Sequence, residues 1–297
     1  MSVISAWIIL TGVLVACACS LVGCFLVLRN MAMIGDAISH SVLPGIVIAF
    51  LISSSRDSFV MMLGASAVGL LTVFLIQFFK QSGVQADASI GVVFTALFAV
   101  GVVLVSLYAG HIDLDLDCVL YGEIAYVPWD TLTIAGIAAG PKAVWAVGLT
   151  LLLSLLLIGM FFKQFKLCSF DPAMAAALGI PAALFHYLLM GLVSMTTVAS
   201  FESVGAILVV GMLVVPPATA YLLTERLSLM IPLSMGIGAA SAVLGYGLAY
   251  LLDASIAGCI ICAAGGLFVL AFLFSPGQGV VVRKWSRTRL SDNRKPA

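Results

Sequence analysis

Long apolar runs separated by short polar breaks make up most of this chain. About nine of them approach the roughly 20 residues that cross a bilayer as a helix. We predict these spans at 6–28, 33–53, 59–79, 88–110, 143–162, 183–200, 203–223, 230–251 and 255–274. The second and sixth runs are the least regular, so the pattern predicts an all-α, polytopic membrane protein with eight or nine transmembrane helices.

Composition and charge agree with this pattern. Of the 297 residues, 63% are hydrophobic and only 9% are charged, whereas soluble domains carry about 25% charged residues. A soluble globular protein is therefore excluded. The 13 basic and 13 acidic side chains leave no net charge, so nothing indicates nucleic-acid binding.

The basic residues between the runs predict an orientation. Cytoplasmic loops of membrane proteins are enriched in Lys and Arg. If Arg29 is cytoplasmic, the same side also receives Lys80, Lys163, Lys166, Arg226 and the basic tail at 283–295. Only Arg56 and Lys142 then lie outside. We expect the N-terminus outside, the C-terminus in the cytoplasm, a transmembrane domain over 1–280 and a basic cytoplasmic tail over 281–297.

One polar stretch interrupts the second apolar run. Asp36 and His40 lie four residues apart, on the same face of a helix, in a segment predicted to lie within the membrane. An ionisable group at that depth costs roughly 2.5–3.5 kcal/mol to insert. A carboxylate and an imidazole can bind a divalent metal, relay protons, or form a purely structural hydrogen bond. The residues alone leave these three interpretations open.

Four motifs then add a resemblance. GDAISHSVLPGIVIAF, which contains Asp36 and His40, is similar to the signature of the manganese/zinc/iron permeases of ATP-binding-cassette (ABC) importers. DLDLDCVLYGEIAYVPWD, SFDPAMAAALGIP and TTVASFESVGAILVVGMLVVPPATAYLLTERL resemble that family in the same order. The resemblance implies a type II ABC importer-like permease in which Asp36 and His40 contact the metal in transit.

A short helix is predicted between the fifth and sixth spans. Asp171 suits an N-cap, Pro172 the first helical position and Gly179 the position after the last turn, while Pro181 blocks continuation. The local signals fit an ordinary loop helix as well as a docking element. The resemblance identifies this segment as the coupling helix that contacts the ATPase, with these residues: Asp171, Pro172, Ala173, Met174, Ala177, Leu178 and Gly179.

Weaker candidates for the pathway lie elsewhere. Glu123 follows an acidic stretch at 111–117 that is expected outside, as a cation-attracting funnel, a docking surface or a solvated loop. Glu202 is expected near the outer surface, as a gate or a loop carboxylate. Pro216 and Pro217 remove backbone hydrogen bonds within the seventh span, and we expect a kink or hinge there.

The chain contains no G-x-x-x-x-G-K-[ST] phosphate-binding loop, so we do not predict an enzyme. As the resemblance implies, ATP would be hydrolysed by a separate cytoplasmic ATPase. A metal-binding protein would deliver the metal outside, and a second permease copy or paralogue would complete a dimer in the bacterial inner membrane. The chain would hold no permanent cofactor. Its cargo would be manganese, with iron or zinc as alternatives. The competing hypothesis is an ion-coupled secondary transporter in which Asp36 and His40 form a relay.

Overall fold

The structure is a computed structural model that describes residues 3–53, 58–108, 124–134 and 137–275. Within those ranges, nine helical segments are long and apolar enough to cross a membrane. One segment is divided into α2 (Met33–Ser41) and α3 (Leu43–Ser53). The other eight are single helices: α1 (Val3–Leu28), α4 (Ser58–Gln81), α5 (Ala86–Tyr108), α7 (Lys142–Met160), α10 (Ala182–Val204), α11 (Ala206–Leu223), α12 (Leu227–Leu252) and α13 (Ile256–Phe274).

The predicted spans correspond to these segments one for one. The largest difference is four residues, at the end of α10, which was predicted to end at 200 and ends at Val204. The sixth run was predicted to be one of the two least regular, yet α10 is one continuous helix. Its hydroxyl groups at Ser194, Thr196, Thr197 and Ser200 are buried among the neighbouring helices. Their polarity therefore reflects the packing of the bundle interior and not a break in the helix.

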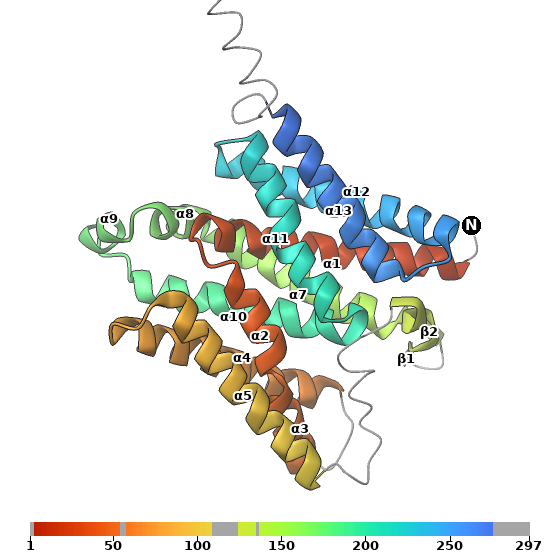
Figure 1. Ribbon diagram of the computed structural model, residues 1–297, viewed down its shortest axis with the longest axis horizontal. Coiled ribbons are helices and arrows are strands. Elements are labelled where there is room, and N and C mark those ends of the chain that lie inside the picture. Colours follow the sequence, from red (N-terminus) through yellow and green to blue (C-terminus); the bar gives the residue numbers. More distant parts are fainter. Residues whose placement is uncertain (1–2, 54–57, 109–123, 135–136, 276–297) are drawn as a thin grey trace, which may run out of the picture.

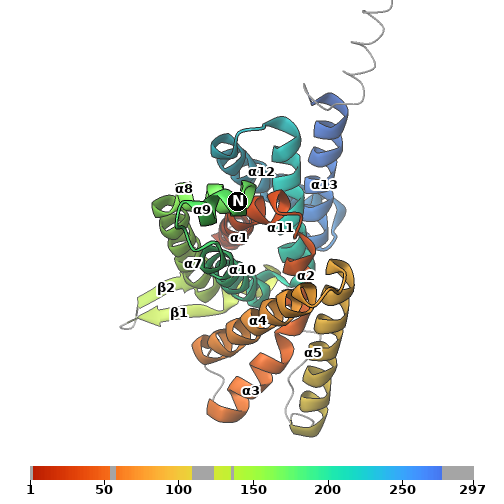
Figure 2. The same cartoon turned by 90° about the vertical axis from the view of Figure 1, so that its left-hand side faces the viewer.

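The helices form two groups joined by α2. α1 is the most buried span and packs against α7, α10, α11 and α12. α3, α4 and α5 form the second group, which Figures 1 and 2 show beside the first. α2 contacts α4 and α5 on one side and α10 and α11 on the other. The helix that carries Asp36 and His40 therefore lies at the junction of the two groups.

The two ends of the bundle carry different short elements (Figure 1). At one end lie α8 (Phe162–Phe170) and α9 (Pro172–Ala177). At the other lie the 3-10 helix η1 (Ile124–Trp129) and an antiparallel hairpin of β1 (Thr131–Ile134) and β2 (Ile137–Pro141). The hairpin was not predicted. Its base is fixed by a 2.7 Å ion pair between Lys142 Nζ and Asp130 Oδ1.

α11 continues through both of its prolines, Pro216 and Pro217, which are buried. Because Pro217 has no N–H group, it cannot donate to the Leu213 carbonyl four residues earlier. Gly23 of α1 packs directly against this carbonyl, and a Cβ atom at position 23 would collide with the Leu213 oxygen and lie 2.9 Å from Pro217 Cγ. The two backbones can approach this closely only because residue 23 has no side chain.

Candidate metal site

The site begins with a break in the second span. Pro44 stands at the second position of α3, and it has no N–H group to donate to the carbonyl of His40 four residues earlier. α2 therefore ends at Ser41, and α3 begins at Leu43. A helix of only nine residues is left between the turn after α1 and this break. That short helix carries both ionisable side chains of the polar stretch.

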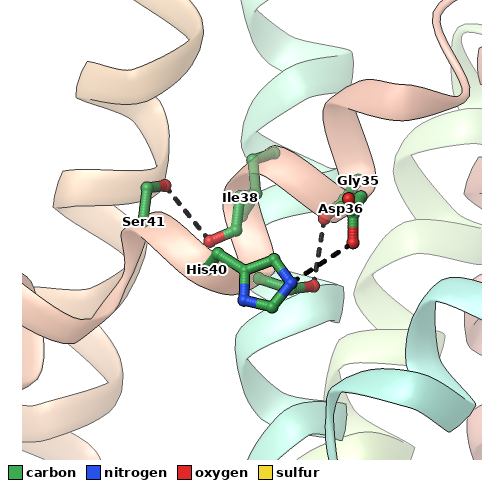
Figure 3. A network of polar contacts seen from close by, with 6 residues as sticks. Gly35, Asp36, Ile38, His40 and Ser41 are labelled. Atoms are coloured by element: carbon green, nitrogen blue, oxygen red, sulfur yellow. Dashed lines mark hydrogen bonds and ion pairs between the residues drawn. The ribbon is translucent and has the colours of Figure 1, made fainter. Parts of the chain in front are cut away.

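Asp36 and His40 face each other across one turn of α2 (Figure 3). His40 Nε2 lies 3.5 Å from Asp36 Oδ1. Two ligands on one tetrahedral ion with bonds of about 2.1 Å would be separated by about 3.4 Å. The observed spacing therefore fits two atoms that bind the same ion, and it also fits a long hydrogen bond when no ion is present.

The neighbouring serines do not belong to this pair. Ser39 Oγ donates to the Gly35 carbonyl at 3.0 Å. Ser41 Oγ donates to the Ile38 carbonyl at 3.2 Å (Figure 3). Ser41 Oγ also lies 2.7 Å from Thr72 Oγ1 of α4. The serines thus stabilise α2 and attach it to α4, while Asp36 and His40 remain available for other partners.

The pair is only partly covered by the chain itself. The side chains of His40 and Asp36 are 36% and 35% exposed. On one side, the imidazole packs against Phe94 and Phe98 of α5, with ring centroids 6.1 and 6.2 Å away. In the part of the chain that the structure describes, no group of three or more His, Cys, Asp or Glu side chains gathers around a common point. If this pair binds a metal, it supplies two ligands, and any others would come from water, from another molecule or from residues outside the described ranges.

The predicted short helix is present as α9, at the end of the bundle (Figure 1). Asp171 Oδ1 accepts a hydrogen bond from Met174 N at 2.9 Å, as an N-cap does. At the other end, Gly179 has a φ of 76°, and the amides of Gly179 and Ile180 donate to the carbonyls of Ala176 and Ala175, as in a Schellman motif. Both ends of α9 are therefore closed by local hydrogen bonds.

The surface of α9 is small and largely apolar. Met174 and Leu178 are 53% and 62% exposed, and the alanines Ala173, Ala176 and Ala177 are also exposed. Ala175 alone is buried and fixes the helix to the bundle. The geometry of the predicted helix is confirmed, whereas its contact with an ATPase stays a prediction.

Of the remaining candidates, those that the structure describes do not join the pair. Glu202 is exposed near the end of α10 and lines a cavity of about 230 Å³ together with Met61 and Met62 of α4. Pro216 and Pro217 are buried within α11. Glu123 and the acidic stretch at 111–117 lie outside the described residues. The roles predicted for these residues in the pathway therefore stay predictions.

The chain is similar to known proteins in sequence and in fold. The profile of the ABC 3 transport family matches residues 2–275. The manganese transport system membrane protein MntD of Bacillus subtilis is 56% identical over 279 residues, which cover 94% of this chain and 95% of that protein. The zinc transport system membrane protein TroD of Treponema pallidum is 44% identical over 277 residues, covering 93% and 75% of the two chains.

A solved structure has the same fold. A chain of PsaBC from Streptococcus pneumoniae, solved in complex with Fab, superposes with a TM-score of 0.79 at 33% identity, and 96% of each chain is covered. The agreement in fold therefore extends over nearly the whole chain.

Proposed function

This chain belongs to the ABC 3 transport family, and from that premise we propose that it is the transmembrane permease subunit of an ATP-driven importer of divalent transition metals. It is a multi-pass protein of the cytoplasmic membrane that forms the translocation pathway. The named relatives favour this function over an ion-coupled secondary transporter.

The observation that carries the proposal is the Asp36–His40 pair. Two ligand atoms 3.5 Å apart, in the short helix between the two groups of the bundle, suit an ion in transit. A closed structural zinc site has four protein ligands and holds its metal permanently. A half-site with two ligands per chain binds more weakly, so it can release the metal to the other side. The metal is therefore cargo and not a resident cofactor.

A second permease chain would complete the site. About a third of the surface of each side chain is open, and an ionisable group facing lipid at this depth is costly. Pairing of two permeases about a two-fold axis would cover the open side and bring two Asp–His pairs close together. This partner would be a second copy of the chain or a paralogue.

ATP would act through the end of the bundle that carries α9. The exposed Met174 and Leu178 provide an apolar contact of the kind that fits a cleft in a cytoplasmic ATPase. In this proposal α9 would lie in the cytoplasm and the hairpin at the outer face, which is also the orientation that Arg29, Lys80, Lys163 and Lys166 favour. A metal-binding protein would then deliver cargo at the hairpin end.

Manganese is the cargo that we propose first. A carboxylate and an imidazole without a thiolate suit manganese and iron as well as zinc, so the ligand chemistry alone does not choose among them. The relatives named above transport manganese or zinc, and MntD, the more similar of these two, is a manganese system membrane protein.

The test is metal uptake by vesicles that contain this chain and its ATPase, with the delivering protein and Mn²⁺, Fe²⁺ or Zn²⁺ outside. We expect Asp36→Asn and His40→Ala to reduce ATP-dependent uptake by at least about tenfold, because each removes one of two ligands. Asp87→Asn removes an exposed carboxylate from the first turn of α5 and serves as the control. Normal uptake by both variants in an assembled complex would show that the pair is structural. Uptake driven by a proton gradient without the ATPase would identify a secondary transporter.

A further inference from the structure

A basic cavity of about 510 Å³ lies at the end of the bundle that carries α9, away from the Asp36–His40 pair. It is enclosed by the turn between α1 and α2, the end of α4, α8, the start of α9 and the start of α10. Its polar lining includes Arg29, Lys80, His186, Asn30 and Gln77, and none of its lining residues carries a carboxylate. The cavity is therefore electropositive and rich in hydrogen-bond donors.

Arg29 lines this cavity, where its hydrogen-bond partners among the described residues are neutral. Its Nε donates to Ser169 Oγ at 3.0 Å, and its Nη1 lies 3.2 Å from His186 Nδ1. In the described part of the chain, no carboxylate lies within 4.0 Å of the guanidinium. Burial lowers the pKa of Arg29 from its ordinary value, yet an arginine remains protonated in proteins. A permanent positive charge is thus held in place by two neutral partners.

The tautomer of His186 follows from this contact. A guanidinium can only donate hydrogen bonds, so His186 Nδ1 must be the acceptor and its ring proton must be on Nε2. Arg29 Nη2 and His186 Nε2 are both buried, and neither has a hydrogen-bond partner. Two buried donors from residues that line the cavity are therefore unsatisfied. Buried polar groups in native proteins nearly always have a partner, so an acceptor-rich ligand beside Arg29 and His186 would suit this wall of the cavity.

We propose that this cavity binds the phosphate group of an anionic phospholipid, with Arg29, Lys80 and His186 as its donors. A phosphodiester offers negative charge and several acceptor oxygens, which is what the unsatisfied donors require. Basic pockets between transmembrane helices on the cytoplasmic side bind lipid headgroups of this class. The volume suits a glycerophosphate headgroup better than a single inorganic phosphate.

The surroundings of the cavity favour a lipid over a soluble anion. Phe78 follows Gln77 on α4 and is 54% exposed, and Leu184 follows the cavity-lining Ala183 on α10 and is 60% exposed. The two helices that border the cavity therefore present exposed apolar side chains on which acyl chains can pack. A phospholipid would place its headgroup in the basic cavity and its acyl chains against the apolar side chains of α4 and α10.

A ligand in this cavity would contact both α9 and the turn that precedes α2. The cavity wall includes Pro172 at the start of α9 and Asn30 in the turn before α2, where Asn30 has a φ of 54°. A lipid phosphate would therefore link α9 to the turn from which α2 extends. This consequence for transport rests on the proposed function, whereas the binding proposal rests on the proposed orientation, which puts this end of the bundle at the cytoplasmic leaflet.

The test is retention of lipid by the purified full chain, measured by native mass spectrometry after exchange into detergent with equal phosphatidylglycerol and phosphatidylcholine. We expect bound phosphatidylglycerol to exceed phosphatidylcholine. Lys80→Gln and Arg29→Gln should each weaken phosphatidylglycerol binding by about fivefold, the effect expected for one Lys or Arg near an anionic headgroup. Lys166→Gln removes an exposed positive charge from α8 outside the cavity and should leave the preference unchanged.

Two further outcomes would overturn the proposal. In the first, inorganic phosphate is titrated against the lipid-free protein. If phosphate binds and Lys80→Gln weakens that binding, while phosphatidylglycerol is not retained in preference to phosphatidylcholine, the ligand is free phosphate and not a lipid. If neither lipid nor phosphate depends on Lys80 or Arg29, the cavity is not an anion site. Arg29→Gln can also disturb folding, because it removes the hydrogen bond to Ser169. The Lys80 side chain has no hydrogen bond or ion pair with the described residues. Lys80→Gln is therefore the decisive variant.

Discussion

The close contact between α5 and the α2–α3 break should be sensitive to any added side chain. Gly101 of α5 is buried against the first residues of α3, and a Cβ atom there would lie 2.8 Å from Pro44 Cδ and 3.0 Å from Leu43 Cβ. The same helix carries Phe94 and Phe98, which pack against His40. Gly101→Ala should therefore push α5 away from the break and loosen the packing of the imidazole.

These distances give the size of the expected change in the free energy of unfolding. Carbon atoms pack best at about 3.5–4.0 Å, so α5 would have to retreat by about 0.5–1 Å. Overpacking of this kind costs about 1–3 kcal/mol. Replacing Gly by Ala inside a helix contributes roughly 1 kcal/mol of stability in return. We expect Gly101→Ala to change the free energy of unfolding by about 0 to 2 kcal/mol in the destabilising direction.

A second glycine of α5 provides the matched control. A Cβ atom at Gly91 would meet no heavy atom of another helix within 4 Å, so Gly91→Ala should stabilise the chain by roughly 1 kcal/mol. Thermal unfolding in detergent should therefore give a Tm at least about 2 °C lower for Gly101→Ala than for Gly91→Ala. Metal uptake should fall in the first variant only. Equal Tm values and equal uptake would refute the argument that this close contact positions His40.

Two further predictions concern the short helices. Asp171→Ala removes the hydrogen bond from Met174 N and should destabilise α9 by about 1 kcal/mol. We expect this loss to lower metal-stimulated ATPase activity in the assembled complex. Asp171→Asn should retain the activity, because Asn caps a helix equally well. Ser41→Ala removes the 2.7 Å contact with Thr72 and should lower the free energy of unfolding by about 0.5–1.5 kcal/mol, as measured by chemical denaturation. As the control, Ser82→Ala removes only an exposed hydrogen bond to the Phe78 carbonyl at the end of α4 and should be nearly neutral.

Most of the fold could be predicted from the sequence, because length and apolarity suffice to define a spanning helix. The short helix α9 was also predictable, since Asp171, Pro172 and Gly179 are local signals that act within one turn. The β1–β2 hairpin was missed because its strands are four and five residues long and lie beside a more conspicuous alternating stretch at 111–117.

The candidate site was predictable in part. The spacing of Asp36 and His40 placed them on one face of a helix, which the structure confirms. The aromatic wall of Phe94 and Phe98 could not be predicted, because it depends on how α5 packs against α2. The same is true of the Arg29 cavity, whose residues come from five parts of the chain. Arg29 was noted only as an indicator of orientation, although its position directly after a long apolar run was a signal for a buried charge.

The contact between Gly23 and the Pro217 turn has a consequence for how relatives of this protein can diverge. Positions 23 and 217 are almost 200 residues apart, yet they share one small space, because the Leu213 carbonyl freed by Pro217 is approached by a backbone without a side chain. A larger residue at 23 is tolerated only if α11 changes locally at the same time. In an alignment of related permeases, positions 23 and 217 should therefore covary.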